Sequence, residues 1–327
     1  MNKTISLFTT ALLLTANFFG YLHASESLPL VEQEPIKPIL KDESLNKDKV
    51  LLGEKLFFDT RLSADNSISC GHCHRLVLGG ADAQQFATGI NNQKGNINSP
   101  TVFNARYNIA QFWDGRADSL EQQALGPVEN PIEMGSNWPE VVSKLSQDIP
   151  LQQEFERIYG QAISAALITD AIAEYERSLV TINAPFDRYL LGDTQAISEQ
   201  AKQGYALFKS YGCISCHQGA NVGGNMFHKM GSLKAYFSPS NDEFLLRDLG
   251  RYNISKDPLD KYVFKVPSLR LVINTAPYFH DGSVKTLSES IKKMARYQLL
   301  REIPDSDIDL MIAFLATLAG KYERIEP

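Results

Sequence analysis

The sequence predicts a mainly α-helical protein, and three observations support this. Residues 163–180 place apolar side chains at three- and four-residue intervals, which is the spacing of an amphipathic helix. Alternating strand patterns are sparse along the 327 residues. Two stretches rich in Asn, Gly and Pro, residues 79–100 and 219–267, predict long ordered loops, and loops of such length are usually functional.

Residues 1–24 have the features of a signal peptide. Lys3 gives a positive start, residues 5–22 are uncharged and mostly apolar, and Leu22-His23-Ala24 supplies a small residue for cleavage. An uncleaved anchor is the alternative, since the apolar stretch is just long enough to span a bilayer. In either case we expect the folded part outside the cytoplasm, in the periplasm.

Cleavage after Ala24 would leave 303 of the 327 residues, enough for two domains. The whole chain has 32 Lys+Arg against 38 Asp+Glu, and removal of Lys3 takes the net charge from −6 to −7. This acidic balance argues against nucleic acid as a partner. A partner steered by charge should present a basic face.

A boundary between two domains is predicted near residue 190. The helix over 163–180 should end near Asn183-Ala184-Pro185, and the polar segment 192–200 follows with Ser198 as the N-cap of the next helix. The expected domains are residues 25–190 and 191–327. Gly-x-x-Leu-Phe at 53–57 and again at 204–208 indicates a weak internal repeat.

All four cysteines lie in two copies of the pentapeptide Cys-x-x-Cys-His, at 70–74 and 213–217. The two thiols of each copy can add to the vinyl groups of one haem while the histidine reaches its iron. The predicted attachment residues are Cys70, Cys73, His74, Cys213, Cys216 and His217. We therefore expect two covalently bound c-type haems in two cytochrome c-like haem domains.

A redox disulfide and half of a zinc site are the alternative uses of a Cys-x-x-Cys pair. Both copies end in histidine, no cysteine is left over, and no second Cys pair or His-x3-His stands nearby to complete a zinc tetrahedron. The complete motifs favour haem.

The reactivity of each haem depends on the sixth iron ligand, opposite the proximal histidine. An occupied position favours electron transfer, whereas an open one lets a small molecule bind. Because the thioether of methionine raises the reduction potential, a His/Met haem is suited to accepting electrons.

Four further strings resemble the bacterial di-haem cytochrome c peroxidases, with the methylamine-utilisation di-haem enzymes as a related branch. The strings are NSPTVFN at 98–104, QFWDGRA at 111–117, GPVENPIEM at 126–134 and APYFHDGS at 276–283. The resemblance covers almost all of the chain after the signal segment. It implies that the first haem is peroxidatic and that the second receives electrons.

The resemblance also implies roles for individual residues. Met294, fourteen residues after His280, matches the sixth ligand of the second haem, and His280 lies near that haem. Met226 and Met230 lie closer to His217 in the sequence and stay as alternative ligands.

Three residues match the family's catalytic positions: Glu133, Gln123 and Trp113. Glu133 matches the distal acid/base, which can take a proton from one peroxide oxygen and deliver it to the other. Gln123 matches its partner beside the peroxide. Trp113 matches the aromatic residue between the haems, although packing is the ordinary role of tryptophan.

A calcium ion between the domains is implied in the same way, with ligands at Asn98 and at the backbone carbonyls of Thr275 and Pro277. No EF-hand or acidic cluster adds to this expectation. His72, inside the first motif, is expected to be an exposed spacer, and His228 to be structural or on the surface.

The function implied is reduction of hydrogen peroxide to water with electrons from a small redox protein, either a mono-haem cytochrome c or a copper protein. A homodimer is compatible with the resemblance. The alternatives are an enzyme that modifies a partner protein, for which tyrosine would be expected in place of Met294, and a non-enzymatic di-haem electron carrier. A haem-based sensor is disfavoured, because it would need an output domain or a partner, and no such segment is visible in the sequence.

One position departs from the family pattern. In many members a histidine on the loop before Asn-Ser-Pro blocks the peroxidatic iron, and Ile90 stands at this position here. Isoleucine cannot bind iron. The sequence therefore predicts an open first haem in the oxidised protein, with Lys94 on the same loop as the alternative blocking residue.

Overall fold

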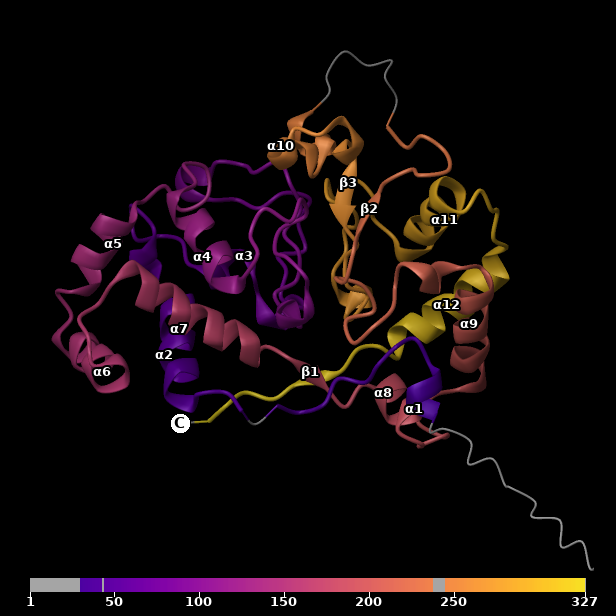
Figure 1. Ribbon diagram of the computed structural model, residues 1–327, viewed down its shortest axis with the longest axis horizontal. Helices are drawn as coiled ribbons and strands as arrows, with labels where there is room; N and C mark the ends of the chain where they lie inside the picture. The colour runs from indigo at the N-terminus through magenta and orange to yellow at the C-terminus, as the bar shows by residue number, and fades with distance from the viewer. Residues whose placement is uncertain (1–29, 43, 238–244, 327) are drawn as a thin grey trace, which may run out of the picture.

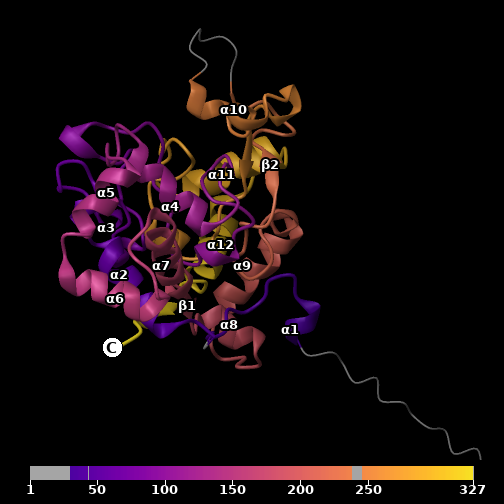
Figure 2. The same cartoon turned by 60° about the vertical axis from the view of Figure 1, so that its left-hand side comes forward.

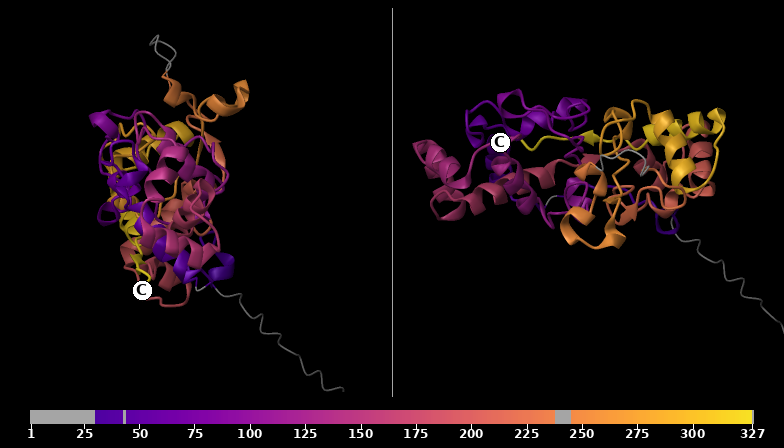
Figure 3. Two further views of the ribbon diagram at one scale, coloured as in Figure 1. Left: turned by 90° about the vertical axis from the view of Figure 1, so that its left-hand side faces the viewer. Right: turned by 90° about the horizontal axis from the view of Figure 1, so that it is seen from above.

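The computed structural model describes residues 30–42, 44–237 and 245–326. These residues form two mostly helical lobes side by side, as Figure 1 and the right-hand view of Figure 3 show. The helices are α1 (Leu30–Gln33), α2 (Lys47–Phe57), α3 (Cys70–Cys73), α4 (Leu120–Glu129), α5 (Trp138–Leu145), α6 (Ile149–Tyr159), α7 (Ala165–Ser178), α8 (Pro185–Leu190), α9 (Glu199–Ser210), α10 (Tyr252–Ser255), α11 (Leu287–Gln298) and α12 (Asp305–Ala316). The strands are β1 (Thr181–Ile182), β2 (Phe227–Lys229), β3 (Val263–Lys265) and β4 (Lys321–Tyr322).

The first lobe is built on the crossing of α2 and α7. Gly53 lies where the two helices meet, and a Cβ atom there would stand 1.9 Å from the carbonyl oxygen of Ala171. Only glycine permits this approach of two backbones. Beside the crossing, the rings of Phe57 and Tyr175 pack edge to face with centroids 5.2 Å apart.

The second lobe repeats this arrangement with α9 and α12, which lie side by side in Figure 2. A Cβ atom on Gly204 would stand 1.9 Å from the carbonyl oxygen of Leu310, and Phe208 packs against Phe314. The Gly-x-x-Leu-Phe repeat therefore marks equivalent helix crossings in the two lobes.

Helix boundaries follow the capping residues. α7 begins at Ala165, because the Ser164 side chain accepts the backbone N–H of Leu167, and it ends at Ser178, so it is shorter than the predicted span 163–180. The Ser198 side chain accepts the N–H of Ala201 at 3.2 Å and caps α9 as predicted.

Strands are few, as the sequence predicted. β1 pairs antiparallel with β4, and β2 pairs antiparallel with β3. The predicted loop 79–100 contains only a single short 3-10 turn, at 90–92. The prediction of an unbroken loop over 219–267 was wrong in part, since it contains β2, α10 and β3; these elements are too short to leave a periodic pattern.

Both ends of the described chain cross between the lobes. Near the N-terminus, Lys37 N–H donates to Gly219 O at 3.2 Å, which attaches this segment to the second lobe, and Ile36 is buried in the core of that lobe. At the other end Arg324 pairs with Glu54 of α2 at 2.8 Å. The division into domains at residue 190 stays a prediction, because each lobe packs a segment from the far end of the chain.

A buried ion pair fixes the loop after the second haem motif. Arg270 forms two hydrogen bonds of 2.8 Å to the carboxylate of Asp187 on α8, and its Nε donates to Ala220 O at 2.8 Å. Both charged side chains are almost fully buried, so the hydrogen bonds between them are needed to offset the cost of removing the charges from water.

None of the described helices is both long and apolar enough to cross a membrane. The predicted signal segment, residues 1–24, lies outside the described residues.

Gly204→Ala should destabilise the protein, because the added methyl group would overlap the Leu310 carbonyl and force α9 away from α12. Over-packing of this kind costs about 1–3 kcal/mol of unfolding free energy, which urea denaturation measures. Gly126→Ala is the matched control within a helix, since its Cβ would meet only Phe112 at an ordinary 3.4 Å. Equal destabilisation by both substitutions would contradict the close crossing.

Candidate haem sites

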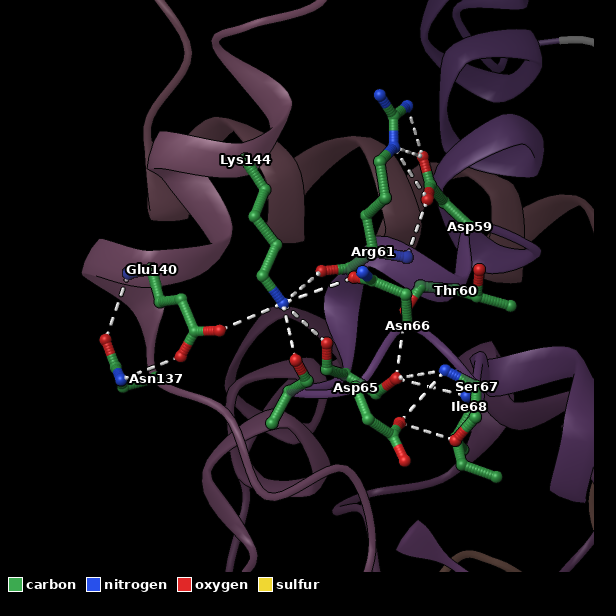
Figure 4. Close-up of polar contacts among 12 residues, drawn as sticks. Asp59, Thr60, Arg61, Asp65, Asn66, Ser67, Ile68, Asn137, Glu140 and Lys144 are labelled. Carbon is green, nitrogen blue, oxygen red and sulfur yellow. Dashed lines mark hydrogen bonds and ion pairs between the residues drawn. The ribbon is translucent and has the colours of Figure 1, made fainter.

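The turn before the first motif is held by α5. Lys144 Nζ donates to Ser63 O at 2.7 Å, and Ser63 Oγ accepts the N–H of Ile68 at 3.0 Å. Figure 4 shows Lys144 reaching from its helix into this turn. These bonds set the position of α3, the one-turn helix that carries Cys70 and Cys73.

The two motif histidines have the same environment. Each Nδ1 lies 3.2 Å from a backbone carbonyl, Gly80 O for His74 and Val222 O for His217. A carbonyl only accepts, so Nδ1 carries the hydrogen and Nε2 keeps a lone pair for a metal. Burial lowers the pKa of His74, and lowers that of His217 to about 4. Both imidazoles are therefore neutral, as iron ligation requires.

A cavity of about 370 Å³ lies beside the first motif. Its wall includes Cys70, Cys73 and His74, and also Gln123 of α4 and Glu133 from the loop that follows. The volume is typical of a ligand pocket, and two thiols with a neutral imidazole are the donor set of a c-type haem. The residues present thus fit this group.

Glu133 is held in place and partly desolvated. Its Oε1 accepts the Asn130 amide at 2.7 Å. Burial raises the pKa of the Glu133 carboxyl above its ordinary value, while Arg116 and the Asn130 bond oppose this shift. A carboxyl with such a pKa can exchange protons nearer to neutral pH than a surface glutamate.

The second cavity, of about 130 Å³, lies beside the second motif. His217 and Met294, which α11 carries, both line it. Neither Met226 nor Met230 is among its described lining residues, and Met230 Sδ instead accepts the Gln298 amide at 3.8 Å. Pairing of Met294 with His217 stays a prediction that this geometry permits.

The thiol-bearing residues of the second motif are not among the residues that line this cavity. Cys213 and Cys216 are half-buried, at and just after the 3-10 turn that follows α9.

One wall is common to the two cavities. Asn98, Trp113 and Lys265 line both of them. Trp113 Nε1 donates to Asn98 O at 2.9 Å, and Trp113 O accepts the N–H of Lys265 at 2.9 Å. The predicted bridging tryptophan therefore lies between the two predicted haem sites.

His280 lies behind this wall. Its ring is 6.4 Å from the Trp113 ring, its Nε2 is 2.8 Å from Asp248 Oδ1, and its carbonyl accepts the Asn98 N–H at 2.7 Å. It is not among the residues that line either cavity.

The residues predicted to bind calcium share one cavity. Asn98, Thr275 and Pro277 all line the second cavity. The Asn98 amide nitrogen donates to Gln84 O at 2.9 Å, so Oδ1 is the atom left for a cation. Within residues 30–42, 44–237 and 245–326, no hydrogen bond reaches this Oδ1 or the two backbone oxygens.

The remaining predicted positions lie as follows. Ile90 is buried, its N–H donates to Glu133 O at 2.8 Å, and it does not line the first cavity. Lys94 is exposed, and its ammonium group donates to the Thr88 hydroxyl. His72 is exposed as expected, and His228 is half-buried in β2.

Two buried charged residues on the cavity walls were missed from the sequence, Lys265 and Glu176. The Lys265 ammonium is buried and donates to Ala110 O at 2.8 Å, and burial lowers its pKa to about 8. Glu176 lines the first cavity. Its position four residues after Ile172, on the apolar stripe of α7, was the signal that could have identified it.

Known proteins resemble this chain closely. A family model described as di-haem cytochrome c peroxidase matches residues 47–195. The cytochrome c peroxidase Ccp of Escherichia coli (strain K12) is 45% identical over 92% of this chain, which spans only 64% of that relative's length. The cytochrome c551 peroxidase of Nitrosomonas europaea is 41% identical, with 97% of this chain and 91% of the relative covered.

A solved structure is also similar. It is a MauG-like protein associated with microbial copper homeostasis, with a TM-score of 0.75 and 26% identity, covering 88% of this chain and 94% of that one. Together with the two Cys-x-x-Cys-His sites, these similarities show that the chain belongs to the di-haem cytochrome c peroxidase family, which carries two c-type haems.

Proposed function

We propose that this protein reduces hydrogen peroxide in the first cavity: H2O2 + 2 H⁺ + 2 e⁻ → 2 H2O. The observation that carries the proposal is the shared wall of Glu133, Gln123 and the first haem motif. The cytochrome c peroxidases among its relatives support the same activity.

Glu133 is proposed to move the proton within the peroxide. Cleavage of the O–O bond needs a proton removed from one oxygen and delivered to the other, and one positioned carboxyl can do both. Asn130 orients this carboxyl, and the Gln123 amide can hydrogen-bond the bound peroxide. The bound haem supplies the redox-active iron.

The second site is proposed to receive electrons and pass them on through the common wall. His217 and Met294 would hold its iron, and the Met thioether would favour electron uptake. Trp113 would couple the two sites. A calcium ion held by the oxygens of Asn98, Thr275 and Pro277 would stiffen this region.

The electron donor is proposed to be a small mono-haem cytochrome c or a copper protein with a basic docking face, since the chain is acidic. Residues 1–24 are proposed to direct the chain to the periplasm. Assembly as a homodimer and a division into domains at residue 190 belong to the same proposal. Modification of a partner protein remains the alternative activity, with Met294 in place of the expected tyrosine as the argument against it.

Glu133→Gln should lower peroxide turnover by about 10²–10⁴-fold, since an amide of nearly the same shape cannot accept the proton. Steady-state assays with a reduced cytochrome donor measure this. In the native protein kcat/KM should fall as the pH drops through the raised pKa of Glu133, because the base acts when deprotonated. Glu129→Gln, an exposed change on α4, is the control. Near-native activity of Glu133→Gln would remove this residue from the mechanism.

Met294→His should lower the potential of the second haem by at least roughly 0.1 V, well within the range that axial ligands span. Potentiometry should show the first haem unchanged and electron transfer between the haems slowed. Met230→Leu is the matched control and should shift neither potential. If Met294→His also leaves both haem potentials unchanged, another side chain binds the second iron.

The fully oxidised protein should react with peroxide without prior reduction, because Ile90 cannot bind iron and packs away from the cavity. Stopped-flow spectra of the ferric protein should change promptly on mixing. Ile90→His should restore a requirement for reduction, whereas Lys94→Met should change nothing. A native protein that reacts only after one-electron reduction would contradict the open site.

A further inference from the structure

Glu176 is a buried carboxyl on the wall of the first cavity that the proposed mechanism does not use. It lies in the last turn of α7, and the residue is only 5% exposed. Its Oε2 is fully buried and has no hydrogen-bond partner among the described residues. An unpaired buried acid costs free energy, so its retention on a cavity wall points to a role there.

The carboxyl shares a cavity wall with the haem attachment point, since Glu176 and Cys70 both line the first cavity. Burial, and next the charge of Glu176, raise the pKa of the Cys70 thiol. Ile172 and Leu120 are apolar residues of the same wall. A haem bound through Cys70 would therefore lie beside a carboxyl with little polar surrounding to screen it.

Few nearby positive charges favour the ionised form of the Glu176 carboxyl. Burial raises the pKa of Glu176 to about 8, Arg177 lowers it, and Glu121 of α4 raises it again. Arg177 is itself paired with Glu121 and with Glu174, which reduces its effect on Glu176. The other acids that line the cavity are Glu133 and Asp114, and Asp114 is paired with Arg116 at 3.1 Å.

Most charged groups on the other helices packed against α7 have partners of their own. On α2, Lys49, Glu54 and Lys55 pair with residues outside the cavity, and on α5 Lys144 pairs with Glu140. On the 3-10 turn 105–107, Arg106 pairs with Asp42. The charge of a bound haem would thus be the largest variable field at Glu176.

We propose that Glu176 is the redox-linked proton site of the first haem. A haem held by Cys70, Cys73 and His74 would supply an iron that takes up one electron, and the Glu176 carboxylate would then take up one proton from solvent and become neutral; oxidation would return the proton to solvent. The ferric centre carries one more positive charge and favours the carboxylate, so reduction raises the proton affinity of the carboxyl. This links electron arrival to proton uptake in a cavity whose reaction consumes two protons for each peroxide.

The inference rests on haem attachment at the first motif and not on peroxide reduction, so its test uses no peroxide. The potential of each haem is measured by spectroelectrochemistry across about two pH units on either side of the Glu176 pKa of about 8. Glu176 should have one pKa when the first haem is oxidised and a higher pKa when it is reduced. Between these two values the potential of the first haem should fall as pH rises, by up to about 59 mV per pH unit, which is a tenfold change in equilibrium constant. The potential of the second haem should change less with pH over the same range.

Glu176→Gln should remove the pH dependence of the first haem's potential while both haems stay attached. Glu176→Met should have the same effect, and it serves as a second variant in case the glutamine amide disturbs the packing. Glu129→Gln, an exposed carboxylate on α4, is the charge-matched control and should keep the slope. Infrared difference spectra of reduction should contain a protonated-carboxyl band in the native protein that is absent from Glu176→Gln. A slope that persists in both Glu176 variants, or one lost only in Glu133→Gln, would overturn the proposal.

Discussion

The two cavities meet at one wall, and the rest of the site is arranged around its hydrogen bonds. Trp113 donates to Asn98 O, Asn98 donates to His280 O, and Lys265 donates to Trp113 O. Three distant parts of the chain are joined in this way, so that a change in one lobe displaces groups that face the other. Trp113 lines both cavities and is fixed in this wall by its hydrogen bond to Asn98 O.

The lobes present their motifs to this wall by the same means. Gly53 and Gly204 let two helices cross at backbone contact, and each crossing is followed by a Cys-x-x-Cys-His motif whose histidine donates to a nearby carbonyl. The two cavities differ in the other side chains that line them. The first cavity has the amide and carboxyl groups of Gln123 and Glu133, whereas the second has Met294. The side chains suited to proton transfer therefore line the first cavity, and the thioether suited to iron ligation lines the second.

Much of this arrangement could be predicted from the sequence, because its signals are local. The haem pentapeptides, the stripe of α7 and the Ser198 cap each depend on residues within one or two turns. Other features depend on contacts between distant segments, which leave no periodic pattern in the sequence. These are the crossing of the chain ends between the lobes, the short strand pair β2 and β3, and the burial of Lys265. Glu176 is an intermediate case, since its place on the apolar stripe was visible but its function depends on the cavity that α3 and α4 complete.

In the proposed enzyme the first haem iron is open, and the second is bound by His217 and Met294. Electron paramagnetic resonance of the oxidised protein, combined with near-infrared magnetic circular dichroism, reports the ligands of both irons in one sample. We expect one high-spin ferric signal from the first haem, and from the second haem one low-spin signal with the near-infrared band of a methionine ligand. Two low-spin signals, or a low-spin haem without that band, would contradict it.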